Sequence, residues 1–337
     1  MSTTTFFDRL QEQIPRDLML ELGSAVLEVE SELRTQVASQ VALVSDVGEL
    51  TLHAGGKRLR PALVYLSALA TGLPVERERL IRLGACMEMI HMATLIHDDV
   101  IDDAATRRGA PTAFSRYGTT ASILGGDVLL AKAMALLAAD GDLAIIRSVS
   151  SAVVELAEGE VRELELRGQF DLTTDDHMHV LRMKTASFIE CCCRVGAMAS
   201  GADKEVTEAL AAFGHHLGMA FQIVDDVLDF QGDSAKTGKP LATDFREGQA
   251  TLPLLLLLPL LSADERAFTQ HKFGNGSTEA DLAQIVGWMQ DRGSLGEAQA
   301  LAVEHIRQAE RSLCALPDSA AASVMNLVAQ FVIARES

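Results

Sequence analysis

Residues 84–96, GACMEMIHMATLI, constrain the fold more than any other stretch because they carry almost no charge. Their apolar side chains recur at the spacing of an α-helix, so the segment predicts a helix without a polar face. Such a helix is stable only when neighbours cover it on all sides, as at the centre of a large bundle. The surrounding chain is rich in good helix formers and lacks the alternating runs typical of strands. We therefore predict an all-α protein.

No low-complexity linker divides the helical segments from one another. A chain of 337 residues would fit two domains of about 150 residues each. The apolar central helix instead favours one large domain over residues 1–337, with its core at about 17–335. The predicted helices span residues 17–51, 57–71, 76–102, 112–117, 119–139, 142–167, 173–200, 203–230, 249–261, 263–270, 278–291, 294–315 and 317–335.

The chain has 47 acidic and 29 basic residues, which gives a formal net charge of -18. This acidity argues against nucleic-acid binding and against attachment to anionic lipid by a basic surface. The N-terminus lacks the features of a signal peptide. The most apolar run, residues 252–261, is far shorter than the ~20 residues that span a bilayer. We therefore expect a cytoplasmic protein without a stable membrane anchor, in which any anion site concentrates the basic residues.

A D-D-x-x-D motif occurs twice, at Asp98, Asp99 and Asp102 and again at Asp225, Asp226 and Asp229. Both copies end long apolar helical stretches, and the first and last Asp of each lie on one helix face. Paired carboxylates at the ends of buried helices are unfavourable unless cations neutralise them. Mg²⁺ suits such sites because it prefers oxygen ligands and substrate phosphates. One copy alone could be a solvated helix end, but two copies favour a metal site.

The segment Gly55-Gly56-Lys57-Arg58-Leu59-Arg60 leads into a predicted helix with cations in its first turn. Free backbone N–H groups at a helix start, flanked by Lys and Arg, form an anion site. Lys57 and Arg60 are three residues apart and can converge on one diphosphate. Without further support, such a helix start would more often be ordinary surface charge.

Further polar residues lie near the aspartate motifs in the sequence. Arg107 and Arg108 follow the first motif, and arginine binds phosphate oxygens in a bidentate manner. His91 precedes Asp98 by two helical turns, so it lies on the same stripe; a core histidine is its alternative role. The second motif has comparable neighbours, namely Gln222 one turn before it, Lys239 in a glycine-bearing loop after it, and the earlier pair Lys184 and Thr185.

Together these residues resemble the trans-polyprenyl diphosphate synthases, from about residue 17 to the C-terminus. The matching stretches are GGKRLRPAL (55–63), HMATLIHDDVIDDAATRRGAPT (91–112), GGDVLL (125–130), AEGEV (157–161), KTASF (184–188), FQIVDDVLDF (221–230) and KTGKPLATDFREGQATLP (236–253). The resemblance implies the isoprenoid synthase fold, a homodimeric helical bundle around a deep central cavity. It also implies that the two aspartate motifs face each other across the cavity mouth and bind three Mg²⁺ and an allylic diphosphate.

The resemblance assigns roles to the individual residues. The metal ligands it implies are Asp98, Asp102 and Asp225, with Asp99, Asp226 and Asp229 in support. The allylic diphosphate contacts are Arg107, Lys184, Thr185, Gln222 and Lys239. The isopentenyl diphosphate contacts are Lys57, Arg60, His91 and Arg108. The residues expected to act in catalysis are Asp98, Asp102, Lys184, Asp225 and Lys239. One departure is Gln249, where the family usually has Lys; we expect weaker allylic diphosphate binding, with activity retained.

The family chemistry explains these residue types. Loss of pyrophosphate from the allylic substrate creates a carbocation, and metals with Lys and Arg stabilise the leaving group. The double bond of isopentenyl diphosphate attacks the cation, and pyrophosphate takes the released proton. No protein general base is then required, in keeping with the absence of a Ser-His-Asp or Cys-His constellation. An apolar cavity excludes water that would quench the cation.

In the family, side chains below the first aspartate motif set the product length. Here Ala93 and Thr94 occupy the positions five and four residues before Asp98, where short-chain enzymes often have an aromatic residue. The two-residue gap within the motif also fits long-chain bacterial enzymes. We predict a product of about C30 to C45 for a quinone side chain. Deeper residues, Met89, Met134 and Leu137, could stop elongation early, so a geranylgeranyl or farnesyl diphosphate synthase is the alternative.

Three further protein classes fit these motifs less well. A non-catalytic subunit of a heteromeric synthase would lack one aspartate motif or its basic partners, and this chain has both. A structural or metal-buffering helical bundle would not need the basic helix start, Arg107-Arg108 and Lys184 together. A terpene cyclase shares an aspartate motif, but the cations assigned to isopentenyl diphosphate argue against it. A long apolar product suggests transient contact with a membrane.

Overall fold

The computed structural model describes residues 14–231 and 241–334. The all-α prediction is confirmed: 79% of the described residues are helical, and the strands among them are the short β1 (Thr106–Arg107) and β2 (Ala110–Pro111). Contacts divide the chain into two compact units. Unit 1 comprises Met1–Ser150, Cys191–Ala211 and Ala315–Met325, and unit 2 comprises Ser151–Glu190, Ala212–Cys314 and Asn326–Ser337. The single-domain organisation remains a prediction.

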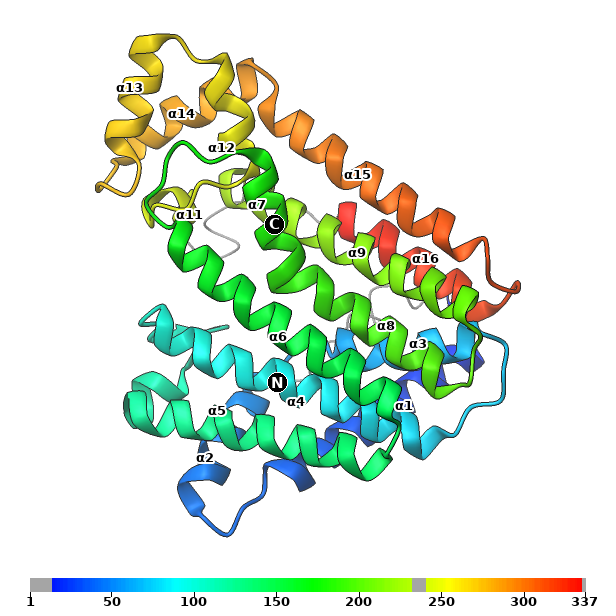
Figure 1. The fold of residues 1–337 in the computed structure, drawn as a ribbon. Helices are drawn as coiled ribbons and strands as arrows, with labels where there is room; N and C mark the ends of the chain where they lie inside the picture. Colours follow the sequence, from blue (N-terminus) through cyan, green and yellow to red (C-terminus); the bar gives the residue numbers. More distant parts are fainter. Residues whose placement is uncertain (1–13, 232–240, 335–337) are drawn as a thin grey trace. The chain divides into compact units, whose positions relative to one another are not determined.

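Unit 1 is built around one central helix. Its elements are α1 (Arg16–Val37), α2 (Ala42–His53), α3 (Leu59–Ala70), α4 (Arg77–Ile101) and α5 (Ala113–Asp140), labelled in Figure 1. Helix α4 packs against each of the other four, and every residue in the range 83–90 is buried. The predicted central position of the nearly uncharged stretch is therefore confirmed within this unit. Helices α6 (Leu143–Leu166), α8 (Ser187–Ala199), α9 (Lys204–Gln231) and α16 (Ala320–Ile333) continue from one unit into the other.

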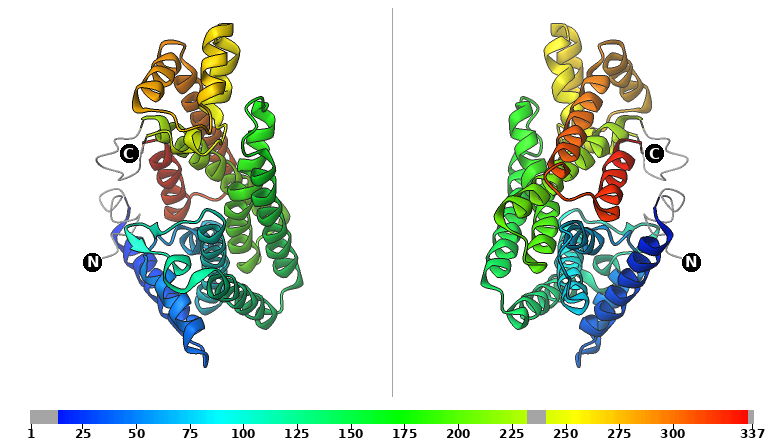
Figure 2. Two further views of the ribbon diagram at one scale, coloured as in Figure 1. Left: turned by 90° about the vertical axis from the view of Figure 1, so that its left-hand side faces the viewer. Right: turned by 90° about the vertical axis from the view of Figure 1, so that its right-hand side faces the viewer.

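Unit 2 contains helices and no strand in its described part, and its helices can be followed in two further views (Figure 2). Its own elements are α7 (Thr174–Leu181), the π-helix η2 (Arg182–Ala186), α11 (Thr243–Arg246), α12 (Leu252–Leu257), the 3₁₀-helix η3 (Leu258–Leu260), α13 (Ala263–Lys272), α14 (Glu279–Asp291) and α15 (Ser294–Leu313). Local sequence explains where several of these begin. Capping boxes, in which a Ser or Thr and an acid three residues later satisfy free N–H groups, start α7, α13 and α14.

The predicted helix 17–51 is wrong, because the chain leaves the helical conformation at Ala38. Lys132 on α5 donates from Nζ to the carbonyl oxygens of Gln36 and Ala38. These are terminal carbonyls that a continuing helix would have used itself. At the break these carbonyls are thus satisfied by a lysine almost a hundred residues away, which local periodicity does not reveal.

Other helix boundaries also differ from the prediction. The break expected near residue 118 exists, since Gly118 has a φ of 80°, although the segments on both sides run on as α5. The predicted helix 173–200 is interrupted by η2, and the predicted helix 249–261 begins only at Leu252. Helix α11 and the β1–β2 hairpin were not expected. Both are too short to carry a periodic signal.

Helix α5 has the length and composition of a membrane-spanning helix. Within the described ranges it is the one helix long and apolar enough to cross a bilayer, and a third of its most apolar window is buried in the structure. It packs against α2 and α4, and core helices of soluble proteins pass the same test. The absence of a membrane anchor stays a prediction.

Candidate active site

The basic segment before α3 is held in an unusual backbone conformation. Arg58 is the residue that caps α3, and its φ of 49° and ψ of 36° lie in the left-handed region. Its buried side chain donates from Nη1 to Oε1 of Glu88 on α4 at 2.9 Å, and from Nη2 to the carbonyl oxygen of Leu52 at 3.3 Å. Lys57 is exposed and Arg60 is half-buried. The sequence therefore predicted an anion site here but did not predict that Arg58 points into the protein.

A tight hairpin places the two arginines that follow the first aspartate motif. Arg107 pairs with Ala110 across β1 and β2, so Arg108 and Gly109 form a two-residue turn. Their φ values of 53° and 77° are those of the favoured type I′ hairpin turn. The turn brings Nη1 of Arg108 onto the carbonyl oxygen of Gly55. The two basic segments that the sequence identified separately thus meet in unit 1.

The electrostatics of His91 show which cations gather around it. Burial lowers the pKa of His91 well below its usual value, and the positive charges of Arg60, Arg108, Arg107 and Arg58 lower it further. His91 is therefore neutral at pH 7 and can donate or accept a hydrogen bond without adding charge. Four predicted diphosphate contacts therefore form one cluster, namely Arg60, Arg107, Arg108 and His91. Arg58 belongs to the same cluster. Such a cluster can bind a diphosphate.

The three carboxylates of the first motif lie in different environments at the end of α4. Asp98 is half-buried, and Asp102 is exposed at the C-terminal cap. Asp99 is buried and accepts a hydrogen bond from Nε of Arg107 at 2.7 Å. Burial raises the pKa of Asp99, while Arg107 opposes that rise. The first motif is therefore linked directly to the cation cluster.

The second motif lies on α9 in unit 2. Gln222 and Asp225 are half-buried. Asp226 is buried, and its Oδ2 lies 2.6 Å from Nε2 of His177 and accepts the backbone N–H of Leu252 at 3.3 Å. Asp229 accepts the backbone N–H groups of Thr243 and Asp244 at 3.1 and 3.2 Å and so caps α11. Asp226 and Asp229 thus hold neighbouring segments of the protein in place.

Lys184 and Thr185 lie within the π-helix η2, beside α6. The Nζ of Lys184 lies 3.0 Å from Oε2 of Glu160 and 2.5 Å from Oε2 of Glu163. Burial lowers the pKa of Lys184, but the two glutamates outweigh burial and raise it above its usual value, so it stays charged. A Cβ on Gly159 would lie 2.8 Å from the backbone nitrogen of Lys184, so this glycine permits the close approach of α6 to η2.

Sequence reasoning missed Asp244, on α11 beside the second motif. Burial raises its pKa to about 8, and the negative charges of Asp229 and Asp226 add to that rise. The crowding of carboxylates indicates a site that a cation would stabilise. His177 and Glu88 were missed as well, because neither belongs to a recognisable motif. Lys239 lies outside the described residues.

The donor set fits a hard divalent cation. All six motif residues are carboxylates, the ligand type that Mg²⁺ prefers. Within the described ranges, no three His, Cys, Asp or Glu side chains converge closely enough to hold a metal by themselves. Mg²⁺ usually binds through one or two carboxylates together with water and substrate phosphates, so such an arrangement suits it. The expected facing of the two motifs, one in each unit, stays a prediction.

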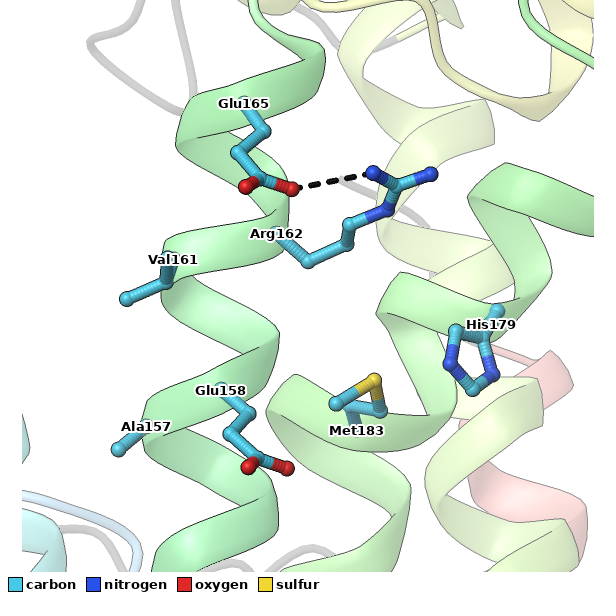
Figure 3. A pocket seen from close by; sticks show the side chains of 7 residues that line it. All are labelled: Ala157, Glu158, Val161, Arg162, Glu165, His179 and Met183. Atoms are coloured by element: carbon cyan, nitrogen blue, oxygen red, sulfur yellow. Dashed lines mark hydrogen bonds and ion pairs between the residues drawn. The ribbon is translucent and has the colours of Figure 1, made fainter.

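Unit 2 also contains a surface groove that none of the predicted site residues lines (Figure 3). Its volume is about 440 Å³. Ala157 and Val161 of α6 and Met183 of η2 form apolar walls, and Arg162 bonds to Glu165 at 3.0 Å on its rim. The groove lies on the exposed side of α6, whose Val161 is 57% exposed.

The family of the chain follows from comparison with known proteins. The model of the polyprenyl synthetase family matches residues 41–289. The chain is 33% identical over 304 residues to the all-trans-nonaprenyl-diphosphate synthase (geranyl-diphosphate specific) of Rhodobacter capsulatus, covering 90% of this chain and 93% of that protein. It is 32% identical to the heptaprenyl diphosphate synthase component 2 of Geobacillus stearothermophilus, covering 94% and 97%. The chain therefore belongs to the polyprenyl synthetase family and is a prenyltransferase.

Solved structures agree with this assignment. A decaprenyl diphosphate synthase from Rhodobacter capsulatus matches with a TM-score of 0.89 and 34% identity, over 96% of this chain and all of that one. A polyprenyl synthase from Caulobacter crescentus, complexed with calcium and isoprenyl diphosphate, matches with 0.86 and 31%, over 95% and 97%. A geranylgeranyl pyrophosphate synthetase from Pyrococcus horikoshii matches with 0.87 and 29%, over 95% and 99%. The predicted isoprenoid synthase fold is thus confirmed.

Proposed function

We propose that this protein condenses isopentenyl diphosphate with an allylic diphosphate, head to tail, in a Mg²⁺-dependent reaction. The observation that carries the proposal is the cluster of Arg60, Arg107 and Arg108 around a neutral His91, linked through Asp99 to the first aspartate motif. Cations concentrated at one place in a protein of net charge -18 suit the binding of an anionic substrate. A diphosphate supplies it.

The described residues suit the two halves of the reaction. Arg60, Arg108 and His91, with Lys57, bind the diphosphate of the isopentenyl substrate and orient its double bond. Lys184 keeps its charge and, with Arg107, binds the diphosphate of the allylic substrate as the C1–O bond breaks. Mg²⁺, when bound by the aspartate motifs, would neutralise the charge that develops on the leaving pyrophosphate. A calcium ion and isoprenyl diphosphate accompany the Caulobacter crescentus relative, which supports this pairing of ligand and ion.

We propose a long-chain product of about C30 to C45. Ala93 is small and fully buried on α4, and Thr94 donates its hydroxyl to the carbonyl oxygen of His91 at 2.8 Å. Neither adds bulk below the first motif. The names of the relatives from Rhodobacter capsulatus and Geobacillus stearothermophilus describe long-chain enzymes. The similarity to a geranylgeranyl pyrophosphate synthetase keeps a short-chain product as the second candidate.

The proposed assembly is a homodimer. Helix α6 exposes Val154, Val161 and Leu164 together with Ala157, at alternating intervals of three and four residues. This is the apolar repeat of a helix–helix seam. A relative carries the name "component 2", so a different subunit is the competing partner. Light scattering of the purified chain distinguishes them: a homodimer has twice the 36.2 kDa mass of one chain, and a monomer would contradict the proposal.

The proposed location is the cytoplasm, with transient membrane contact when a long apolar product leaves. Vesicle co-sedimentation tests this contact. We expect more of the protein to bind to the vesicles after substrates are added. Equal binding with and without substrates would contradict the proposed contact.

Radiolabelled isopentenyl diphosphate and an allylic primer test the proposed reaction. The purified protein is incubated with both in the presence of Mg²⁺ or of a chelator, and the dephosphorylated products are separated by chromatography. We expect labelled products of about C30 to C45 with Mg²⁺ and none with the chelator. A dominant C15 or C20 product would reject the long-chain claim. Pyrophosphate release without any need for isopentenyl diphosphate would reject the condensation.

A further inference from the structure

Glu88 is a charged residue inside the central helix of unit 1. It lies on α4, one turn before His91, and is 4% exposed. A buried carboxylate is unfavourable unless a charged or hydrogen-bonding group pairs with it. Arg58, itself 4% exposed, supplies that partner through Nη1 at 2.9 Å. The mechanism proposed above assigns no role to either residue, so their burial at this place needs another explanation.

Arg58 connects the basic loop to three helices. Beyond its bond to Glu88 on α4, it donates to the carbonyl oxygen of Leu52 at the end of α2, and its Nε lies 3.4 Å from Oε1 of Glu30 on α1. Its own backbone is left-handed, a conformation that is unfavourable for a residue with a Cβ. The side-chain contacts therefore hold a strained residue that stands between Lys57 and Arg60.

The same guanidinium group lies beside Gly56 of the loop. A Cβ on Gly56 would lie 2.9 Å from Nη1 of Arg58 and 3.2 Å from Nη1 of Arg108. Both guanidinium groups thus lie close to Gly56, and a side chain at this position would displace at least that of Arg58. Arg108 also donates to the carbonyl oxygen of Gly55. A shift of Arg58 would consequently move the surface on which Arg108 rests.

Glu88 also acts on the remaining cations of the cluster through its charge. Burial lowers the pKa of Arg60 and of Arg108, and the negative charge of Glu88 is the largest effect that opposes this in each case. The Glu88 carboxylate therefore interacts with three arginines. It contacts Arg58 directly and acts on Arg60 and Arg108 through its charge. This arrangement keeps the cations close together in the absence of a substrate.

We infer that Glu88 is a positioning residue for isopentenyl diphosphate: by holding Arg58 it fixes the Gly55-Gly56 loop and the start of α3, and so places Lys57, Arg60 and Arg108. The inference rests on the proposed function, because it concerns the diphosphate that those three cations bind. It predicts that disturbing the pair weakens the use of isopentenyl diphosphate and leaves the use of the allylic diphosphate unchanged.

The test compares Glu88→Gln, Arg58→Met and the double variant that carries both. The single variants leave a partner buried without its charge and are expected to be destabilised. The double variant removes both charges, so it is expected to regain stability while still lacking the anchor of the loop. We expect the KM for isopentenyl diphosphate to rise about tenfold or more in all three, with the allylic KM within about twofold of wild type, because a small displacement of binding groups has large kinetic effects.

A matched control breaks another ion pair of unit 1. Asp140 pairs with Arg79 at 2.7 Å and is also largely buried, and neither residue belongs to the cation cluster. Asp140→Asn should lower the unfolding midpoint and leave both KM values unchanged. A rise in the KM for isopentenyl diphosphate in this control would show that any loss of a buried pair has this effect, and would overturn the inference.

The outcomes separate this inference from the proposed function. If the wild-type protein condenses the substrates and the folded double variant keeps the wild-type KM for isopentenyl diphosphate, the Glu88–Arg58 pair is merely structural and the inference is wrong. If the wild-type protein does not condense them, the proposed function fails and the inference fails with it. Calorimetric titration with isopentenyl diphosphate alone gives a second readout, in which the double variant should bind at least about tenfold more weakly.

Discussion

The Nε2 of His177 lies 2.6 Å from Oδ2 of Asp226, so the middle carboxylate of the second aspartate motif is bound to a neighbouring helix. Asp99, the middle carboxylate of the first motif, is bound to Arg107 in a similar way. Both carboxylates are buried. In each motif the second Asp thus holds a neighbouring segment of the protein, which agrees with the supporting role that the resemblance implies.

This arrangement predicts unequal effects for two substitutions on α9. Asp226→Asn weakens the contact with His177 and should reduce condensation by about 10- to 100-fold, as expected for a group that orients a site. Asp225→Asn removes a proposed metal ligand and should reduce it by at least about 10³-fold. Steady-state rates at saturating Mg²⁺ measure both. Equal losses in the two variants would argue against separate roles.

Replacement of Gln249 by Lys tests the departure from the family pattern. Gln249 is half-buried and donates its backbone N–H to the carbonyl oxygen of Asp244 at 2.8 Å. A lysine there adds a positive charge near the second motif, so Gln249→Lys should lower the KM for the allylic diphosphate about three- to tenfold. The KM for isopentenyl diphosphate should stay unchanged. Gln249→Met is the matched control, since it keeps the size and adds no charge, and it should not lower the allylic KM.

The stability of the protein should fall as the pH falls below about 6.5. In unit 2, Nδ1 of His216 lies 3.0 Å from Nδ1 of His305, so one ring donates and the other accepts. Burial lowers the pKa of His216 to about 4, and the charges of His215 and His305 add to this, while Glu190 and Glu304 oppose it. Burial also lowers the pKa of His305.

Because both folded-state pKa values lie below the unfolded value, the unfolded chain binds protons first on acidification. The stabilising effect is full above about pH 6.5 and is lost as the pH falls towards about 4. Denaturant unfolding at about pH 7 and about pH 5, on either side of the unfolded pKa, measures it. The double variant His216→Asn and His305→Asn should lose less stability than wild type over this interval. An equal loss in both proteins would contradict the assignment.

Product length should depend on the side chain at position 93. Ala93 is 2% exposed on α4, and Ala93→Phe places an aromatic ring below the first motif. We expect a shift towards C15 and C20 products, with a stability loss of about 1–3 kcal/mol for overpacking. Chromatography of the dephosphorylated products checks it. Leu20→Phe on the exposed face of α1 is the control, and it should leave the product distribution unchanged.

The sequence predicted the features that depend on local pattern. The nearly uncharged stretch in residues 84–96 lies mostly in the buried core of unit 1 as expected, and its helical periodicity together with its lack of a polar face indicated this. The basic loop and the Arg107-Arg108 pair were also identified, and the structure brings them together at Gly55. Their meeting depends on a type I′ turn, for which Gly109 was the available signal.

The features that were missed depend on contacts between distant residues. Helix α11 begins where Asp229 caps it from fourteen residues earlier, and a four-residue helix has no periodicity of its own. Arg58 looks like Lys57 and Arg60 in the sequence, yet its partner Glu88 lies thirty residues away. The pairing with Glu88 distinguishes the inward-pointing Arg58 from its neighbours. No local sequence pattern could reveal this pairing, because the two residues are far apart in the chain.

Incorporation of radiolabelled isopentenyl diphosphate by wild type and by Asp98→Ala tests the central claim most directly. Asp98 is half-buried at the end of α4, and its replacement should leave the helical circular-dichroism signal unchanged. We expect Mg²⁺-dependent incorporation by wild type and a loss of at least about 10³-fold in the variant. Absence of incorporation by wild type, or full incorporation by a folded Asp98→Ala protein, would contradict it.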